Sequence, residues 1–150
     1  MKRRIAPMLF LLAGCSGPAP VQSQASAIEL HGQRFAVELA TDDTSRQHGL
    51  MMRSALAPDH GMLFVFPQLG PQAFWMKNTL IPLDILYFDE KRRLVSMQVD
   101  VPPCKADPCP TYPSGAPAIY VLELSAGTAR RIGAKPGDVL KIDGDIGPVR

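Results

Sequence analysis

Short runs of strand length, some alternating between apolar and polar residues and some continuously apolar, recur along the chain after residue 27, and a period of two is typical of strands with one buried face. Residues 94–101 alternate most cleanly. Residues 28–39 predict a hairpin whose turn lies at Gly32. Met62–Phe66 is a continuous apolar run of strand length, which indicates a buried central strand. Further strands are predicted over 73–78, 83–88, 118–124 and 139–142.

Two short helices and several loops separate these strands. Residues 41–44 offer an N-cap for a helix that continues to Met52, and Ser125 can cap a second helix that runs to Ile132. Proline-rich residues 67–71 and 102–117 predict loops. Seven or eight strands with two small helices predict a mainly β domain over 27–150, built as a β-sandwich or a partly open barrel.

The first residues have the features of an export signal. A basic start at Met1–Arg4 precedes a short apolar stretch, and small residues precede Cys15. This arrangement resembles a bacterial lipobox, which implies cleavage after residue 14 and acylation of Cys15. Residues 15–26, rich in Gly, Pro, Ser, Gln and Ala, then predict a flexible tether. An ordinary signal peptide with a chance cysteine is the alternative.

The predicted location is therefore the periplasmic side of the cell envelope, with the membrane as a partner through the lipid anchor. Ser16, rather than aspartate, follows the cysteine, and the lipoprotein resemblance then implies sorting to the outer membrane. Removing the signal takes away Lys2, Arg3 and Arg4, which leaves 13 basic residues against 14 acidic ones. No basic footprint for nucleic acid remains.

Cys104 and Cys109 are the cysteines left after processing, and in an oxidising compartment we expect them to form a disulfide. Zinc would need two more ligands, and a redox pair would need a different spacing, so both are weaker alternatives. The closed loop is short, and its disulfide would mainly fix the shape of the proline-rich segment.

Six sequence blocks occur in the order found in the family called domain of unknown function 192, which the chain resembles over about 28–142. The resemblance implies a single β-rich domain and carries no established activity. The blocks are His48–Met51, Gly61–Phe66, Phe74–Thr79, Pro82–Ile85, Tyr120–Leu124 and Gly137–Asp138.

The block at 74–79 is the strongest candidate for a binding site. Trp75 and Lys77 would share one face of a strand, with Asn78 beside them and Asp84 seven residues after Lys77. An aromatic ring, an amine and a carboxylate can bind a polar ligand such as an envelope glycan or peptide. We interpret the protein as a binding module with this site.

Two alternatives use the same residues. Lys77 and Asp84 could serve as acid and base in an enzyme that acts on an envelope polymer, or they could be a buried pair with only a structural role. No Gly-x-Ser-x-Gly motif and no unpaired cysteine indicate a nucleophile.

Copper is the third functional hypothesis, and no other cofactor is indicated. Thioether and imidazole groups together suit Cu(I), and His48, Met51 and Met52 lie close in sequence. His60, Met62 and Met76 could add ligands, although Met62 and Met76 lie in apolar strands, where methionine commonly fills the core.

Overall fold

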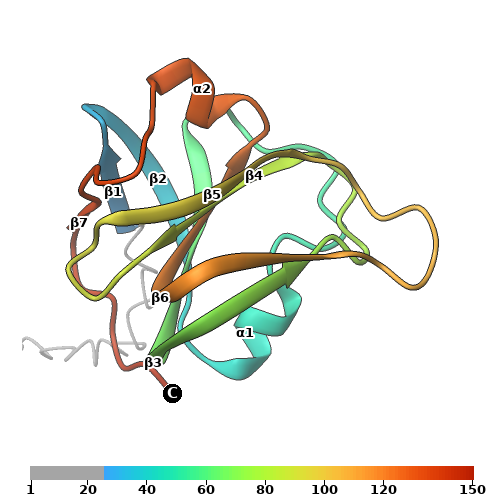
Figure 1. Cartoon of the computed structure of the whole chain (residues 1–150), viewed down its shortest axis with the longest axis horizontal. Coiled ribbons are helices and arrows are strands. Elements are labelled where there is room, and N and C mark those ends of the chain that lie inside the picture. Colours follow the sequence, from blue (N-terminus) through green and yellow to red (C-terminus); the bar gives the residue numbers. More distant parts are fainter. Residues whose placement is uncertain (1–25) are drawn as a thin grey trace, which may run out of the picture.

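A computed structural model describes residues 26–150 and shows seven strands and two short helices over that range (Figure 1). The predicted signal peptide, Cys15 and the tether up to residue 25 lie outside the described residues. No helix among residues 26–150 is long and apolar enough to cross a membrane. The elements are β1 Ser26–Leu30, β2 Gln33–Ala40, α1 Asp43–His48, β3 His60–Trp75, β4 Leu83–Phe88, β5 Leu94–Val101, β6 Thr111–Ser125, α2 Thr128–Ile132 and β7 Lys141–Asp143.

All seven strands form one sheet in the order β5-β4-β6-β3-β2-β1-β7. Every pair is antiparallel except β2 with β3, which is parallel. The predicted hairpin is confirmed, because Leu30 pairs with Gln33 across the turn at Gly32. Strands β6 and β3 lie inside the sheet, and their pairing is the longest in it, although register shifts interrupt it.

The two edges of the sheet approach each other without closing. Arg93, just before β5, forms a bridge with Val139, just before β7. The backbone amide of Leu94 also donates to Asp138, at 2.8 Å. The mainly β fold is thus a strongly curled open sheet, as the sequence predicted.

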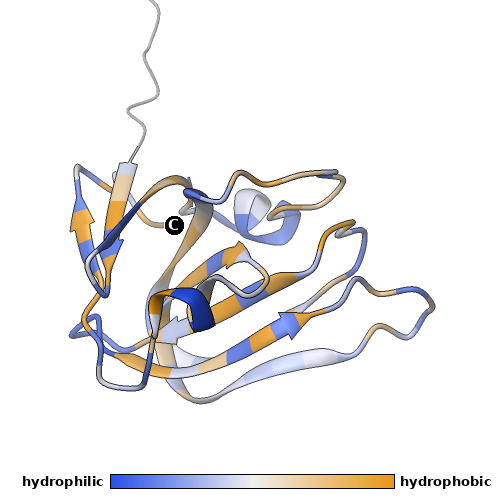
Figure 2. Cartoon of the chain, turned by 90° about the horizontal axis from the view of Figure 1, so that it is seen from above, coloured by the Kyte–Doolittle hydropathy of each residue, from blue (hydrophilic) through white to orange (hydrophobic). Residues whose placement is uncertain are grey.

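The inside of the curl holds the first of two hydrophobic clusters. Hydrophobic residues lie mainly on the strands, whereas the short helices are mostly hydrophilic (Figure 2). Leu63 and Val65 of β3 point into this cluster, as do Leu122 and Leu124 of β6. Such a shared interior is the main source of stability in a curled sheet, because it removes apolar surface from water.

The second cluster covers the outer face of β3, β4 and β6. Met62 and Phe64 face it from β3, and Ile85 and Tyr87 face it from β4. Since both faces of these strands are buried, the run 62–66 is continuously apolar, and the run 83–88 is apolar except for Asp84. The buried central strand predicted at 62–66 is confirmed, and the functional candidates lie over this outer face.

The proline-rich segments correct two predictions. The loop predicted at 67–71 is part of β3, and residues 111–117 of the predicted loop 102–117 belong to β6. The two strands stay paired through register shifts, so that Pro71 lies opposite Pro117. Proline lacks an amide hydrogen and is tolerated where the hydrogen-bond ladder is interrupted.

Both predicted helices exist but are shorter than expected. Asp42 caps α1 by accepting from the amide of Ser45 at 2.9 Å, and the helix ends at His48, before Gly49. Helix α2 begins at Thr128 rather than near Ser125 and ends before Gly133, as predicted. Glycines at 127 and 133 adopt left-handed conformations at the two ends of α2.

Candidate functional site

The segment after β3 makes a tight turn over the outer cluster. Strand β3 ends at Trp75, and the buried side chain of Met76 anchors the chain that follows. The Met76 carbonyl accepts from the amides of Thr79 and Cys104, at 3.2 and 3.3 Å. The turn thereby holds Trp75 at the surface, where 45% of the residue is exposed.

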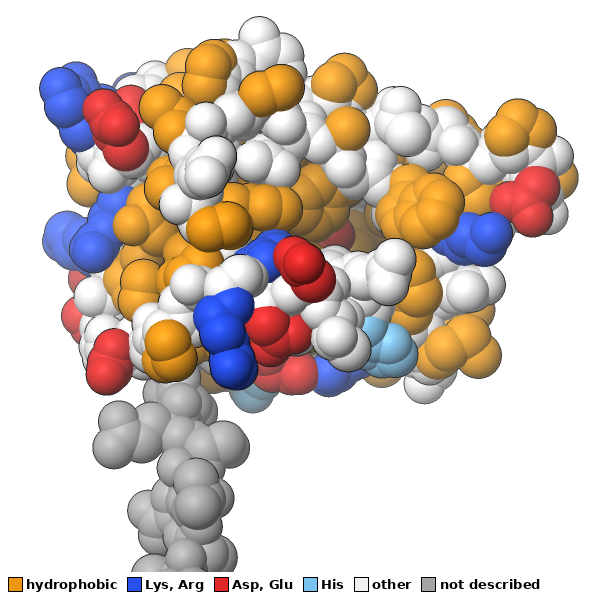
Figure 3. All heavy atoms as spheres, turned by 90° about the horizontal axis from the view of Figure 1, so that it is seen from below, with side chains coloured by type: hydrophobic (Ala, Val, Ile, Leu, Met, Phe, Trp, Pro, Cys, Tyr) orange, Lys and Arg blue, Asp and Glu red, His pale blue; other side chains and the backbone are white. Residues whose placement is uncertain are grey.

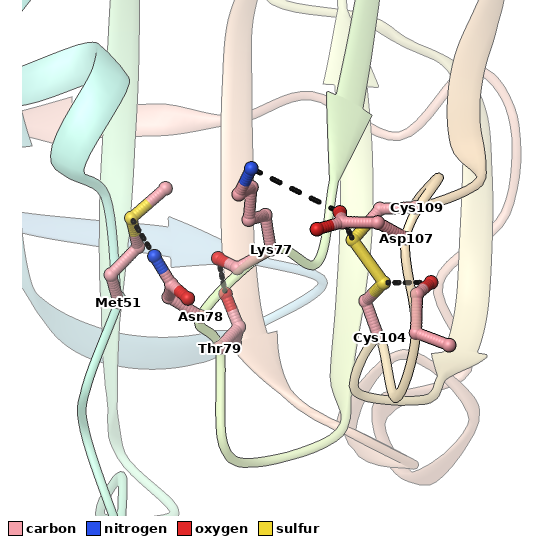
Figure 4. Close-up of a disulfide and its surroundings, with 8 residues drawn as sticks. Met51, Lys77, Asn78, Thr79, Cys104, Asp107 and Cys109 are labelled. Carbon is pink, nitrogen blue, oxygen red and sulfur yellow. Dashed lines mark hydrogen bonds and ion pairs between the residues drawn. A yellow bond between two sulfur atoms is a disulfide. The ribbon is translucent and has the colours of Figure 1, made fainter.

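The side chain of Lys77 lies beside the disulfide loop, with its amine joined to Asp107 (Figure 4). Its amine is 5.5 Å from the centroid of the Trp75 ring and 3.9 Å from a carboxylate oxygen of Asp107. Cys104 and Cys109 form the predicted disulfide, which closes the loop that carries Asp107. Asn78 is exposed in a left-handed conformation, and its amide group is 4.0 Å from the sulfur of Met51.

Asp84 is not part of this constellation, so the expected Lys77–Asp84 pair is wrong. The Asp84 side chain is fully buried, and its two oxygens accept three backbone amides. The donors are Asp100 at 2.8 Å, Gly127 at 3.1 Å and Ala129 at 2.7 Å. Helix α2 has no side-chain cap of its own at Gly127, and the Asp84 carboxylate supplies that missing acceptor.

A narrow pocket lies next to Trp75, between α1 and the end of β3. One face of the molecule is hollowed between hydrophobic side chains, with basic, acidic and histidine side chains around it (Figure 3). The pocket is lined by residues of α1 and the turn after it, by the aromatic residues of β3, and by one residue of β6: Arg46, Gln47, His48, Gly49, Leu50, Met51, Phe64, Phe74, Trp75, Thr79 and Glu123.

The β6 residue in this pocket is Glu123, which sequence reasoning did not single out. It pairs with Met62 on one side and Ile85 on the other, so its side chain shares the outer face with the second cluster. Only 4% of the residue is exposed. Within residues 26–150 its carboxyl group makes no hydrogen bond, and every fully buried polar side-chain atom there has a partner. The carboxyl oxygens therefore reach the surface of the pocket.

Burial changes the acidity of this group. Removal from water disfavours the carboxylate and raises the pKa of Glu123 to about 8. Burial, and to a smaller extent the negative charge of Glu123, raise the pKa of Tyr87, whose hydroxyl donates to the carbonyl of Tyr112 at 2.6 Å. An unpaired carboxyl in an apolar surrounding costs free energy, and such groups gather at functional sites.

The end of α1 forms the wall of the pocket opposite the aromatic residues. A Cβ atom on Gly49 would come 3.3 Å from the Phe64 ring, so a glycine lets the chain lie against the sheet here. Arg46 reaches inward, where its guanidinium donates to Val65 at 2.8 Å and to Asp43 at 2.7 Å. It also donates to the carbonyl of Arg150. The Arg46 guanidinium therefore donates to these three acceptors and not to Glu123.

The copper candidates are only partly brought together. His48 and Met51 line the pocket, whereas Met52 is 68% exposed and lies outside the lining. Met62 and Met76 are buried in the second cluster, as expected for core residues. His60 contacts Asp59, at 2.8 Å. Among residues 26–150, no three His, Cys, Asp or Glu side chains are grouped closely enough to hold a metal ion.

Two more open hollows lie near the pocket. One shares Arg46, Gln47, Phe74 and Trp75 with the pocket and continues toward Gln72. The other lies between Lys77 and Asn78 on one side and the disulfide loop on the other. Trp75 therefore lines the pocket and one of the hollows, and Lys77, whose amine is 5.5 Å from the centroid of the Trp75 ring, lines the other hollow.

Comparisons with known proteins give a family and a fold. The model of the family DUF192, described as an uncharacterised ACR, matches residues 26–142. A solved protein from Sinorhizobium meliloti 1021, provisionally described as a transcription regulator, is 41% identical, with a TM-score of 0.71 over 79% of this chain and 94% of that one. A protein of unknown function from Novosphingobium aromaticivorans DSM 12444 is 32% identical, with a TM-score of 0.73 over 85% and 94%. No match was found among proteins of curated function.

Proposed function

The chain belongs to the DUF192 family, and we propose that it is a binding module for a small polar ligand, such as an envelope glycan or peptide. The binding surface is the depression around Trp75. Lys77 and Asn78 form its polar rim, and the pocket beside Trp75 forms its deepest part. Asp84, which tethers α2, has no place in this site.

Exposure of Trp75 is the observation that carries the proposal. A large aromatic ring usually contributes to stability by being buried, yet 45% of Trp75 faces solvent at the edge of a pocket. Aromatic residues in such positions commonly stack on sugar rings or on planar groups of peptides. Lys77 above the ring supplies a donor for a ligand oxygen.

The rim is positioned by covalent and backbone constraints rather than by side-chain packing. The disulfide closes the 104–109 loop, and the backbone bond from Cys104 to Met76 holds that loop beside the turn. On the other side, the amide of Met52 donates to the Asn78 carbonyl at 2.8 Å. A preformed rim loses little entropy when a ligand binds, which favours affinity.

The proposed location is the periplasmic side of the outer membrane, through acyl chains on Cys15 and the tether 15–26. The argument is the sequence of the first residues alone. Replacing Cys15 by Ala should release the protein from the membrane fraction of cells that express it. Continued sedimentation of C15A with membranes, with detergent rather than salt required for extraction, would contradict the lipid anchor.

A thermal-shift screen of the purified protein against glycans, muropeptides and metals tests the binding function. A ligand that binds the native state raises its melting temperature. We expect glycans or peptides to produce the shift, and Trp75→Ala to abolish it. Leu80→Ala is the matched control, because Leu80 is 51% exposed and lines neither the pocket nor the two hollows. Equal shifts in the wild type and W75A would contradict the site, and a shift with copper alone would favour the metal hypothesis.

A further inference from the structure

The residues around Glu123 give no structural reason for a carboxyl group at this position. It occupies a central strand between Met62 and Ile85, where an apolar residue would pack without loss. Within residues 26–150 its carboxyl group takes part in no hydrogen bond or ion pair, and no fully enclosed side-chain oxygen there lacks a partner, so the Glu123 oxygens open onto the pocket. A buried carboxyl that lacks both, yet reaches a pocket, is suited to receive a partner from outside.

The shape of the pocket limits what that partner can be. The pocket leaves room of about 30 Å³, enough for a group of one or two non-hydrogen atoms. Phe64, Phe74 and Trp75 form the aromatic part of its wall. An ammonium group is about as large as a water molecule, so it fits this room, and aromatic faces attract cations.

The charge of the Glu123 carboxylate also favours an ammonium group as the ligand. A carboxylate or phosphate would meet the Glu123 carboxyl and be repelled once that group ionises. Arg46, the one guanidinium in the lining, already donates to Val65 and Asp43. An incoming ammonium would supply the charge and the donors that Glu123 lacks.

We propose that Glu123 is a ligand-binding residue, and that the pocket beside Trp75 accepts a primary ammonium group of the ligand. This inference rests on the proposed binding function and specifies its ligand class. The rest of the ligand would lie on Trp75 and along the rim toward Lys77. Both an amino sugar with a free amine and a lysine-like side chain carry this chemistry.

Binding of an ammonium should release a proton. At neutral pH the raised pKa keeps most Glu123 carboxyls protonated, and an ammonium beside the group lowers that pKa again. The affinity should therefore increase as pH rises toward 8 and decrease once the ligand amine itself loses its proton. The other titratable or charged groups that line the pocket are Arg46 and His48 of α1. Tyr87 of β4 lies outside the lining, but near enough to Glu123 for the glutamate charge to raise the pKa of its hydroxyl.

Isothermal titration calorimetry on the purified full chain tests the inference with three probes. Glucosamine and Nα-acetyl-lysine amide each carry one ammonium and represent the two sources, and glucose replaces the ammonium of glucosamine by a hydroxyl. We expect at least one ammonium probe to bind better than glucose, and Glu123→Gln to weaken it by about tenfold or more. His48→Gln separates any contribution of the imidazole to the pH dependence.

The test has a second readout that needs no variant. Titrations in two buffers with different ionisation enthalpies should show proton release when the ammonium probe binds to the wild type. Equal affinity for glucose and glucosamine, unchanged by E123Q, would overturn the inference while leaving the binding module intact. Absence of binding by both ammonium probes would also overturn it. Loss of all binding in W75A but not in E123Q would support the proposed function alone.

Discussion

Two carboxylates lie on adjacent central strands and have opposite surroundings. Asp84 of β4 pairs with Leu124, and its neighbour Ile85 pairs with Glu123 of β6, so the two acids are separated by one register step. Both are buried. Asp84 accepts three backbone amides, whereas Glu123 has no partner within residues 26–150 and faces a pocket. Burial alone therefore does not distinguish a structural acid from a functional one, and the hydrogen bonds do.

Removing Asp84 should produce the largest loss of stability. Asp84→Ala leaves three buried amides without an acceptor, and hydrogen bonds to charged groups contribute about 1.5–3 kcal/mol each. We expect the free energy of unfolding to fall by at least about 3 kcal/mol in urea titrations. Asp89→Ala is the control, because Asp89 also accepts two amides, but at an exposed turn where water can replace it. Similar losses in both variants would contradict the tethering role of Asp84.

Glu123→Gln should be more stable than the wild type at high pH, and this difference in the free energy of unfolding should depend on pH. The folded pKa of about 8 lies above the unfolded value, so the folded protein retains a proton that the unfolded chain releases. The stability from this proton is complete below the unfolded pKa of about 4.3 and is lost as pH rises through about 8. Each pKa unit between the unfolded and the folded value corresponds to about 1.4 kcal/mol in the free energy of unfolding.

Urea unfolding of wild type and E123Q from pH 4 to 9 measures this effect. The wild type should lose stability relative to E123Q across that range. Glu38→Gln, which changes an exposed carboxylate paired with Arg53, is the matched control and should leave the dependence unchanged. Parallel curves for wild type and E123Q would show that Glu123 titrates normally, and the contrast with Asp84 would fail.

Removal of the disulfide should have a smaller and more local effect. Closing a loop of this length contributes about 2 kcal/mol, so the double variant Cys104→Ser, Cys109→Ser should lose at most about that much stability. Hydrogen exchange should accelerate within 102–110 and leave β4 and β6 protected. A much larger loss would mean that the loop supports the second cluster, against which Cys104 packs, and not only the rim of the site.

The smallest effects on stability are expected at the rim itself. Trp75 is half exposed, and the amine of Lys77 is 3.9 Å from the exposed carboxylate of Asp107. Surface pairs of this kind contribute about 0–1 kcal/mol, so Lys77→Met should change the free energy of unfolding by less than about 1 kcal/mol. The same measurement on W75A should show a modest loss. A loss of several kcal/mol in K77M would indicate a buried partner and contradict the exposed rim.

The sequence predicted the fold better than the site, for physical reasons. Apolar runs such as 62–66 reflect burial on both faces, which is a local property and can be recognised directly. The prolines at 67–71 and 111–117 predict loops, but both segments are strands, since the register shifts that accommodate the prolines depend on the pairing of two strands far apart in the sequence. The residue pattern of a single strand contains no information on a register shift with its partner strand.

The same limitation explains the errors at the site. Asp84 was grouped with Lys77 because seven residues separate them, but the intervening turn at 76–79 directs Lys77 toward the disulfide loop. The sequence does contain a sign of a buried acid at Glu123, since this is the one acidic residue inside the apolar run 118–124 of a predicted strand. An isolated acid there is usually interpreted as a solvent-facing residue, and only the register with Met62 and Ile85 shows that it is buried.

Direct titration of the Glu123 side chain is the most decisive measurement for the contrast between the two acids. Carboxyl ¹³C chemical shifts of labelled protein, assigned by comparison with E123Q, report the pKa of each acid separately. We expect Glu123 to titrate near pH 8 in the free protein and at lower pH in saturating glucosamine or Nα-acetyl-lysine amide. Titration of Glu123 at the ordinary value of about 4.3, unaffected by either amine, would contradict it.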